Sequence, residues 1–254
     1  MLIRLPNGLV ESSGMELFDY AEIDELKGKQ QNYLVDESLV IGNIGHVQKI
    51  LEDLVLSFQN EQGLRWKGKI SSGIQRLPVE DLEVILIRIR EKTFGPEYFL
   101  SAKCDKCGSE IKNLKLDLSK LEVDKLSLDE MMEPKVVHLP KMDIEIELGP
   151  LRLKELLESL KLIKDKKDSL ITGFLKLSMR RMGEKTNITN ADIEKIPASD
   201  IYYLNKEAKN IKLMGNIDTN IQVKCTNKKC KQEFEFKLNP FDPDFFDPSR
   251  GSIT

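Results

Sequence analysis

Two short stretches, C-D-K-C-G at residues 104–108 and C-T-N-K-K-C at residues 225–230, decide how this chain is organised. Together they contain all 4 cysteines of the sequence. Apolar and polar residues alternate beside both stretches, in 98–102 before the first and in 233–238 after the second. Because alternation of this kind is typical of β-strands, each cysteine pair is expected in the turn of a β-hairpin. The sequence therefore predicts that the same hairpin is built twice, with a long insertion between the copies.

The cysteine spacing predicts a metal site. Residues 1–18 lack the apolar core of a signal peptide, so the protein is expected in a reducing cytoplasm, where disulfides are rare. Two thiolates about two to four residues apart at a hairpin turn can bind one ion, and two such turns complete a tetrahedral Zn²⁺ shell. Four sulfur ligands leave no open position, so the predicted Zn²⁺ is structural. The predicted ligands are Cys104, Cys107, Cys225 and Cys230.

The two turns differ in one respect. Gly108 follows the first pair and suits a turn residue with positive φ, whereas the second turn is longer and has no glycine. Redox-active thiols and cysteine pairs without metal are the alternatives to zinc. The first pair has redox-type spacing, but no thioredoxin-like βαβ pattern surrounds it.

The remaining sequence predicts an α+β fold: a zinc-ribbon-like β-hairpin pair with a helical N-terminal region and a helix-rich insertion between the two cysteine knuckles. Apolar residues at helical spacing predict amphipathic helices over 47–58 and 78–92. Between the knuckles, the patterns predict strands at 135–139 and 143–148 and helices at 151–165, 168–182 and 199–212. Residues 1–20 are expected to be extended or irregular, and a polar helix is expected over 21–34.

These patterns divide the chain into five segments. The predicted segments are a mainly helical N-terminal region at 1–95, the first zinc-knuckle hairpin at 96–118, an inserted strand pair with helices at 119–214, the second zinc-knuckle hairpin at 215–240 and an extended Phe/Pro-rich C-terminal arm at 241–254. Prolines in the arm oppose helix and central strand. Its aromatic residues Phe241, Phe245 and Phe246 are expected to pack either against their own domain or in the groove of a partner.

Composition argues against several classes of function. The formal net charge is −3, and no apolar run approaches the roughly 20 residues of a membrane helix, so neither nucleic acid nor a membrane is an expected partner. With only 2 histidines and no catalytic or nucleotide-binding motif, the chain is not expected to be an enzyme or to take a small-molecule substrate. The G-N-I-G stretch at 42–45 imitates a KH loop, but a loop before an amphipathic helix explains the same glycines.

The order of these features resembles the T4-type phage baseplate hub assembly chaperones, which also occur in contractile injection systems. The resemblance rests on an arginine-containing apolar helix at 86–90, T-F-G at 93–95, the two cysteine pairs and F-E-F-K-L-N-P-F at 234–241. It covers residues 78–118 and 198–246. Two departures are Asp105, where the family usually has proline, and the wider second pair.

The resemblance implies a role as well as a fold. It implies that the four cysteines are zinc ligands and that the chain is a structural protein of virion assembly, acting on other baseplate, hub or tail proteins. Its expected place is the host bacterial cytoplasm during assembly, with the virion baseplate as the second location. A zinc-containing nucleic-acid-binding module is the alternative, because lysines surround both cysteine pairs, although aromatic residues for base stacking are lacking.

Overall fold

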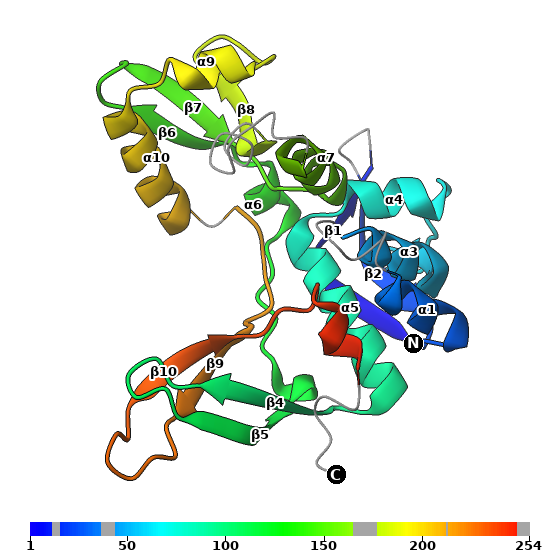
Figure 1. The fold of residues 1–254 in the computed structure, drawn as a ribbon. Coiled ribbons are helices and arrows are strands. Elements are labelled where there is room, and N and C mark those ends of the chain that lie inside the picture. Colours follow the sequence, from blue (N-terminus) through cyan, green and yellow to red (C-terminus); the bar gives the residue numbers. More distant parts are fainter. Residues whose placement is uncertain (12–15, 37–43, 165–176, 212, 248–254) are drawn as a thin grey trace.

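The computed structural model describes residues 1–11, 16–36, 44–164, 177–211 and 213–247 (Figure 1). The fold is mixed α+β with small antiparallel sheets, as the sequence predicts. Strand and helix segments occur in the order N-terminal sheet, first hairpin, inserted unit and second hairpin. None of the described helices combines the length and apolar composition needed to cross a membrane.

The N-terminal region is a three-stranded sheet with helices packed against it. The sheet has the order β1-β2-β3, with strands β1 (Leu2–Val10), β2 (Leu17–Ile23) and β3 (Val55–Gln59). The helices are α1 (Gly28–Val35), α3 (Gly45–Leu54), α4 (Ile70–Arg76) and α5 (Val79–Phe94). Their apolar faces form one large core with the sheet, in which Phe58, Leu51 and Ile85 are fully buried.

This region differs from the mainly helical prediction in two ways. Leu2–Val10 and Leu17–Ile23 form strands, so the helix expected over 21–34 does not begin at residue 21. The helix expected over 47–58 ends at Leu54 because Val55 and Phe58 belong to β3. Val55 pairs with Ile23 and Phe58 with Ala21, so the backbone groups find partners in β2. Leu51 and Leu54 of α3 and Val55 and Phe58 of β3 lie in the same core, so the apolar pattern does not show where the helix ends.

The two cysteine hairpins form separate two-stranded sheets, as predicted. The first consists of β4 (Glu97–Lys103) and β5 (Glu110–Asp117), and the second of β9 (Asn220–Lys224) and β10 (Glu233–Lys237). A 3-10 helix, η1 (Leu118–Lys120), follows the first hairpin. Figure 1 shows the two hairpins side by side, away from the N-terminal sheet.

The inserted unit has its own hydrophobic core. Its elements are α6 (Leu128–Met132), β6 (Lys135–Leu139), β7 (Ile144–Leu148), α7 (Leu153–Lys164), β8 (Met179–Met182), α9 (Asn190–Glu194) and α10 (Ala198–Asn210). Leu139, Ile146 and Leu204 are among the buried residues of this second core. The predicted strands and the helices near 151 and 199 are confirmed.

One predicted helix of this unit is wrong in its last part. Residues 179–182 form strand β8, which pairs with β7, instead of continuing a helix from 168. Buried Met179 faces the second core in this pairing, and sheet pairing with β7 overrides the local helical periodicity. The part of that prediction at 165–176 lies outside the described residues.

A buried hydrogen-bond network joins the N-terminal sheet to the segment before β9. The side-chain amide of Asn7 donates to the carbonyl of Gly215 at 2.9 Å, and the Gly215 amide donates to Oδ1 of Asn7 at 2.7 Å. Asp81 of α5 accepts from the backbone amides of Asn7 and Gly8 at 3.0 and 2.8 Å. A Cβ on Gly215 would lie 2.5 Å from the carbonyl oxygen of Asp124, so the close approach requires glycine.

Candidate metal centre

Both hairpins close around their cysteines in the same way. The ladder of the first ends at the pair Lys103 and Glu110, and that of the second at Lys224 and Glu233. Beyond each ladder, the amide of the first cysteine donates to the carbonyl of the residue two positions after the second cysteine. These bonds are Cys104 to Ser109 at 3.0 Å and Cys225 to Gln232 at 2.8 Å. The repeat seen in the sequence is therefore also a repeat of backbone geometry.

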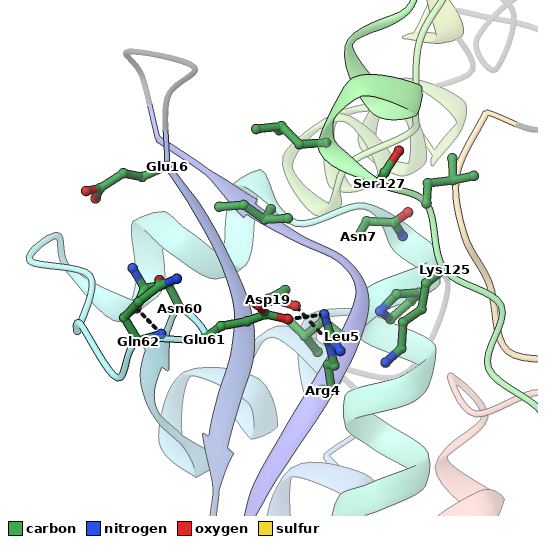
Figure 2. A pocket seen from close by; sticks show the side chains of 14 residues that line it. Arg4, Leu5, Asn7, Glu16, Asp19, Asn60, Glu61, Gln62, Lys125 and Ser127 are labelled. Carbon is green, nitrogen blue, oxygen red and sulfur yellow. Dashed lines mark hydrogen bonds and ion pairs between the residues drawn. The ribbon is translucent and has the colours of Figure 1, made fainter.

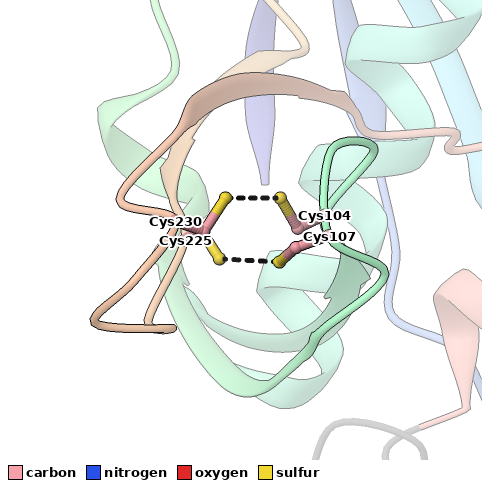
Figure 3. A group of neighbouring side chains, drawn as sticks. All are labelled: Cys104, Cys107, Cys225 and Cys230. Carbon is pink, nitrogen blue, oxygen red and sulfur yellow. Dashed lines mark hydrogen bonds between the residues drawn. The ribbon is translucent and has the colours of Figure 1, made fainter.

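The four cysteine sulfurs converge between the hairpins (Figure 3). Sγ of Cys104 lies 3.9 Å from that of Cys230, and Sγ of Cys107 lies 3.6 Å from that of Cys225. All four sulfurs lie within 4.8 Å of one another, and all are free thiols. A Zn²⁺ ion with four sulfurs about 2.3 Å away has sulfur–sulfur edges of about 3.8 Å, so the thiols fit a tetrahedral site.

The site is buried on one side and open on the other. Cys104 and Cys225 are 1% and 4% exposed, whereas Cys107 is exposed. Leu100 and Ala102 of the first hairpin and Val223 of the second are buried but belong to neither of the two large cores. Two-stranded hairpins are marginally stable by themselves, so one ion bound by four sulfurs would add a substantial link between the two hairpins.

Two polar residues beside the sulfurs were not identified from the sequence. Nδ2 of Asn227 donates to Oγ of Ser109 at 3.2 Å, which connects the second knuckle to the first. The same Oγ lies 3.2 Å from Sγ of Cys107. Polar side chains next to metal ligands orient those ligands. The only sequence signal was a serine and an asparagine two positions after Cys107 and Cys225, which turns of many kinds share.

The thiols influence one another's ionisation. Hydrogen bonds with the side chain and backbone of Ser109 lower the pKa of Cys107 to about 6. A backbone hydrogen bond with Asn227 lowers the pKa of Cys225, but desolvation and the neighbouring sulfurs outweigh it and raise that pKa to about 12. Four crowded thiols therefore do not all ionise without a compensating charge. A divalent cation supplies that charge, which is the chemical reason that this donor set suits Zn²⁺.

The aromatic residues near the C-terminus lie against the protein itself. Phe245 and Phe246 are 1% and 2% exposed and belong to the large core, and half-buried Phe241 packs on it. Pro243–Phe246 form a 3-10 helix, η2, so the arm expected to be extended is folded there. Short turns accept prolines at their start, and Pro243 occupies that position. A partner-binding role of the three phenylalanines stays a prediction.

The loop that imitates a KH motif lies partly outside the described residues, since 42 and 43 are among those not described. Gly45 begins α3, in agreement with a loop that leads into an amphipathic helix. His46 is buried, and its Nε2 lies 3.0 Å from the carbonyl oxygen of Phe241. The imidazole thus contacts the C-terminal segment of its own chain.

A polar pocket of about 590 Å³ lies beside β1 (Figure 2). Arg4 dominates it, with Nε 2.8 Å from Oδ2 of Asp19 and Nη2 2.6 Å from Oε1 of Glu61. Lys125 lines the same pocket, and desolvation together with Arg4 lowers its pKa. Its residues come from four separate segments of the chain, so no local sequence pattern pointed to this pocket. The ion pairs of Arg4 stabilise the local fold, and we assign no chemistry to the pocket.

Comparison with known proteins gives one result. The model of the family described as T4 bacteriophage base plate protein matches residues 44–247. Neither the curated proteins nor the solved structures gave a match. The matched region includes both hairpins, all four cysteines and the inserted unit, and it covers well over half of the 254 residues. The chain therefore belongs to the T4 bacteriophage base plate protein family.

Proposed function

We propose that this chain is a non-enzymatic assembly chaperone or hub component of a contractile phage tail baseplate, stabilised by one structural Zn²⁺. The observation that carries the metal part is the convergence of four sulfurs, within 4.8 Å, from hairpins far apart in the sequence. Family membership supports the baseplate part. The proposed ligands are Cys104, Cys107, Cys225 and Cys230.

The ion would stabilise the fold and take no part in a reaction. Cys107 and Cys225 are 118 positions apart in the sequence, so a shared ion makes the intervening chain a closed loop. Closing a long loop reduces the conformational entropy of the unfolded chain. The two hairpins, 96–118 and 215–240, would then present one rigid surface to a partner. Zn²⁺ with four thiolates is closed to substrate, which agrees with a structural role.

The proposed partners are other baseplate, hub or tail proteins, and the proposed site of action is the cytoplasm of the infected bacterium. We propose no membrane and no small-molecule substrate. Family membership points to the virion baseplate as a location. An assembly chaperone would leave before the particle is complete, whereas a hub component would remain in it.

Affinity purification of the tagged chain from infected cells, followed by mass spectrometry, tests the partner assignment. The expected result is enrichment of baseplate or hub proteins over a mock-infected control. Mass spectrometry of purified mature particles then separates the two roles, because only a hub component is retained. Failure to enrich any tail protein would contradict the proposal. Steeply salt-dependent binding to DNA or RNA would instead support the nucleic-acid alternative.

A further inference from the structure

A second cavity, of about 340 Å³, lies where the N-terminal sheet meets the inserted unit. It is separate from the cysteine centre. One wall is the end of β1, at Leu9 and Val10, and another is formed by Met131 and Met132 of α6. Arg76 and Arg152 also line it. The cavity therefore combines an apolar wall with two guanidinium groups.

Two helices begin beside this cavity. The amide of Val79, the first residue of α5, donates to the carbonyl of Leu151 at 2.9 Å. The amide of Leu153, the first residue of α7, donates to the carbonyl of Leu77 at 3.3 Å. These bonds hold the two helix N-termini next to each other. Each N-terminus carries a partial positive charge that adds to that of the arginines, and the first-turn acidic residues Glu80, Asp81 and Glu155 offset part of it.

The arginines of this corner differ in their partners. Nη2 of Arg76 donates to the carbonyl of Val10 at 2.6 Å, and Arg180 pairs with Glu155 at 3.2 Å. Within the part of the chain that the structure describes, the guanidinium of Arg152 has no hydrogen bond or ion pair. Its pKa is lowered by desolvation, and Arg180 and Arg76 lower it further while Glu155 opposes them. Arg152 is exposed, and the carboxylate of Glu155, which accepts from its backbone amide at 2.9 Å, offsets part of the repulsion from the other two arginines.

The apolar wall is unusually rich in methionine. Met131, Met132 and Met214 line the cavity, and Met132 is 59% exposed. Methionine is flexible and polarisable, so it adapts to apolar side chains of different shapes. Among the described residues that line the cavity, Glu11 carries a carboxylate and Arg76 and Arg152 carry guanidinium groups. An apolar residue beside an acidic one is the chemistry that complements this surface.

We propose that this cavity binds an acidic segment of another baseplate protein, whose carboxylate pairs with Arg152 while a neighbouring apolar side chain packs on Met131 and Met132. The inference rests on the proposed function for the class of partner. Guanidinium binds carboxylate through two parallel hydrogen bonds, which gives direction as well as affinity. Arg76 stays on Val10 and adds charge without leaving its backbone partner.

Fluorescence anisotropy tests this site with a labelled hexapeptide of alternating leucine and glutamate. The wild-type chain is expected to bind it, and to bind a matched peptide with glutamine for glutamate at least about tenfold more weakly, because the neutral amide cannot form the charge-assisted hydrogen bonds with Arg152. Arg152→Gln should weaken binding of the acidic peptide by a similar factor, and Met132→Gln should weaken it as well. No binding by the wild type would overturn the inference.

Lys154→Gln is the matched control. Lys154 lies two positions away on α7, is exposed and pairs with Glu158 at 4.0 Å, so its loss removes a positive charge outside the cavity. The inference would be overturned if Lys154→Gln and Arg152→Gln weakened binding of the acidic peptide equally, or if the wild-type chain bound a hexanucleotide as tightly as the acidic peptide. Either result would show that the surface attracts anions in general. Enrichment of tail proteins by the wild-type chain tests the proposed function separately from the peptide experiment. Arg152→Gln is expected to retain its fold, so a loss of peptide binding in this variant would report on the cavity alone.

Discussion

Lys231 follows Cys230 as Gly108 follows Cys107, and both residues have a positive φ, 49° for Lys231 and 69° for Gly108. The amide of Gly108 donates to the carbonyl of Cys104 at 2.8 Å, and that of Lys231 to the carbonyl of Asn227 at 3.1 Å. The second knuckle is longer, yet it ends in the same left-handed turn. Because Lys231 has a Cβ, it adopts a backbone conformation that costs an L-residue about 1–2 kcal/mol.

Lys231→Gly is expected to stabilise the protein by about 0.5–1 kcal/mol. The backbone strain that glycine removes at positive φ in the folded state exceeds the entropy that glycine adds to the unfolded chain. Urea denaturation of the two proteins under the same zinc concentration measures the difference. Lys229→Gly is the control, since Lys229 lies in the same loop and is not among the described residues with positive φ. A Lys231→Gly protein no more stable than Lys229→Gly would refute the turn geometry.

The cysteine hairpins could be predicted because their signals are local. Alternation and cysteine spacing need only the residues of each hairpin, and the convergence of the pairs followed from the preference of Zn²⁺ for four ligands. Strand β1 could not be predicted in this way. Pro6-Asn7-Gly8 has turn composition, but the amide of Asn7 finds its partner in Asp81, 74 positions away. A sequence pattern does not contain that contact.

The same limit explains what was missed around the candidate site. Asn227 and Ser109 meet only because the two hairpins face each other, and neither residue is unusual for its own turn. The C-terminal segment was expected to be extended because prolines exclude regular elements. Burial of Phe245 against α5 and β4 folds it into a 3-10 turn instead, since one short turn leaves few backbone groups without partners.

Stability is expected to depend on pH through Glu83. Desolvation raises the pKa of this half-buried carboxyl from 4.5 to about 7, with Lys237 lowering it and Glu80 raising it further. Because the folded pKa lies above the unfolded one, the stability that Glu83 contributes is fully present below about pH 4.5 and is lost as the pH rises through about 7. Glu83→Gln removes that loss.

The variant is therefore expected to be more stable than the wild type by about 1–2 kcal/mol at pH 8 and almost equal to it at pH 5. Thermal denaturation of both proteins at the two pH values gives the difference, and any change in metal content with pH affects both alike. Glu235→Gln provides the comparison, because Glu235 is exposed on β10. An equal gain at both pH values would show that charge burial is not the cause.

Phe245→Ala is expected to destabilise the protein by about 3–5 kcal/mol, as truncation of a buried phenylalanine usually does. The ring contacts Tyr98 at a centroid distance of 5.2 Å, and its backbone carbonyl accepts from Nε of buried Arg90 at 2.9 Å. Chemical denaturation measures the loss, and Phe241→Ala, at a half-buried position, should lose less. Normal stability with weakened partner binding would favour the partner-groove alternative instead.

Replacing Cys104 and Cys107 together by serine is expected to remove bound zinc and to destabilise the protein by about 3 kcal/mol or more, because much of the metal-binding free energy is folding free energy. Inductively coupled plasma mass spectrometry gives the zinc content, and thermal unfolding with and without a chelator gives the stability. The chelator should lower the melting temperature of the wild type and leave that of the double variant unchanged.

Ser109→Ala separates ligand loss from disturbance of the knuckle. It removes a hydroxyl beside Cys107 and the partner of Asn227 but leaves all four sulfurs, so it should retain about one zinc per chain, as a four-ligand site does, with a smaller loss of stability. A wild-type chain without zinc, or a double variant that melts like the wild type, would contradict the metal assignment. Because both hairpins contribute two sulfurs each, loss of either pair should have the same effect, and Cys225→Ser with Cys230→Ser provides that second, independent measurement.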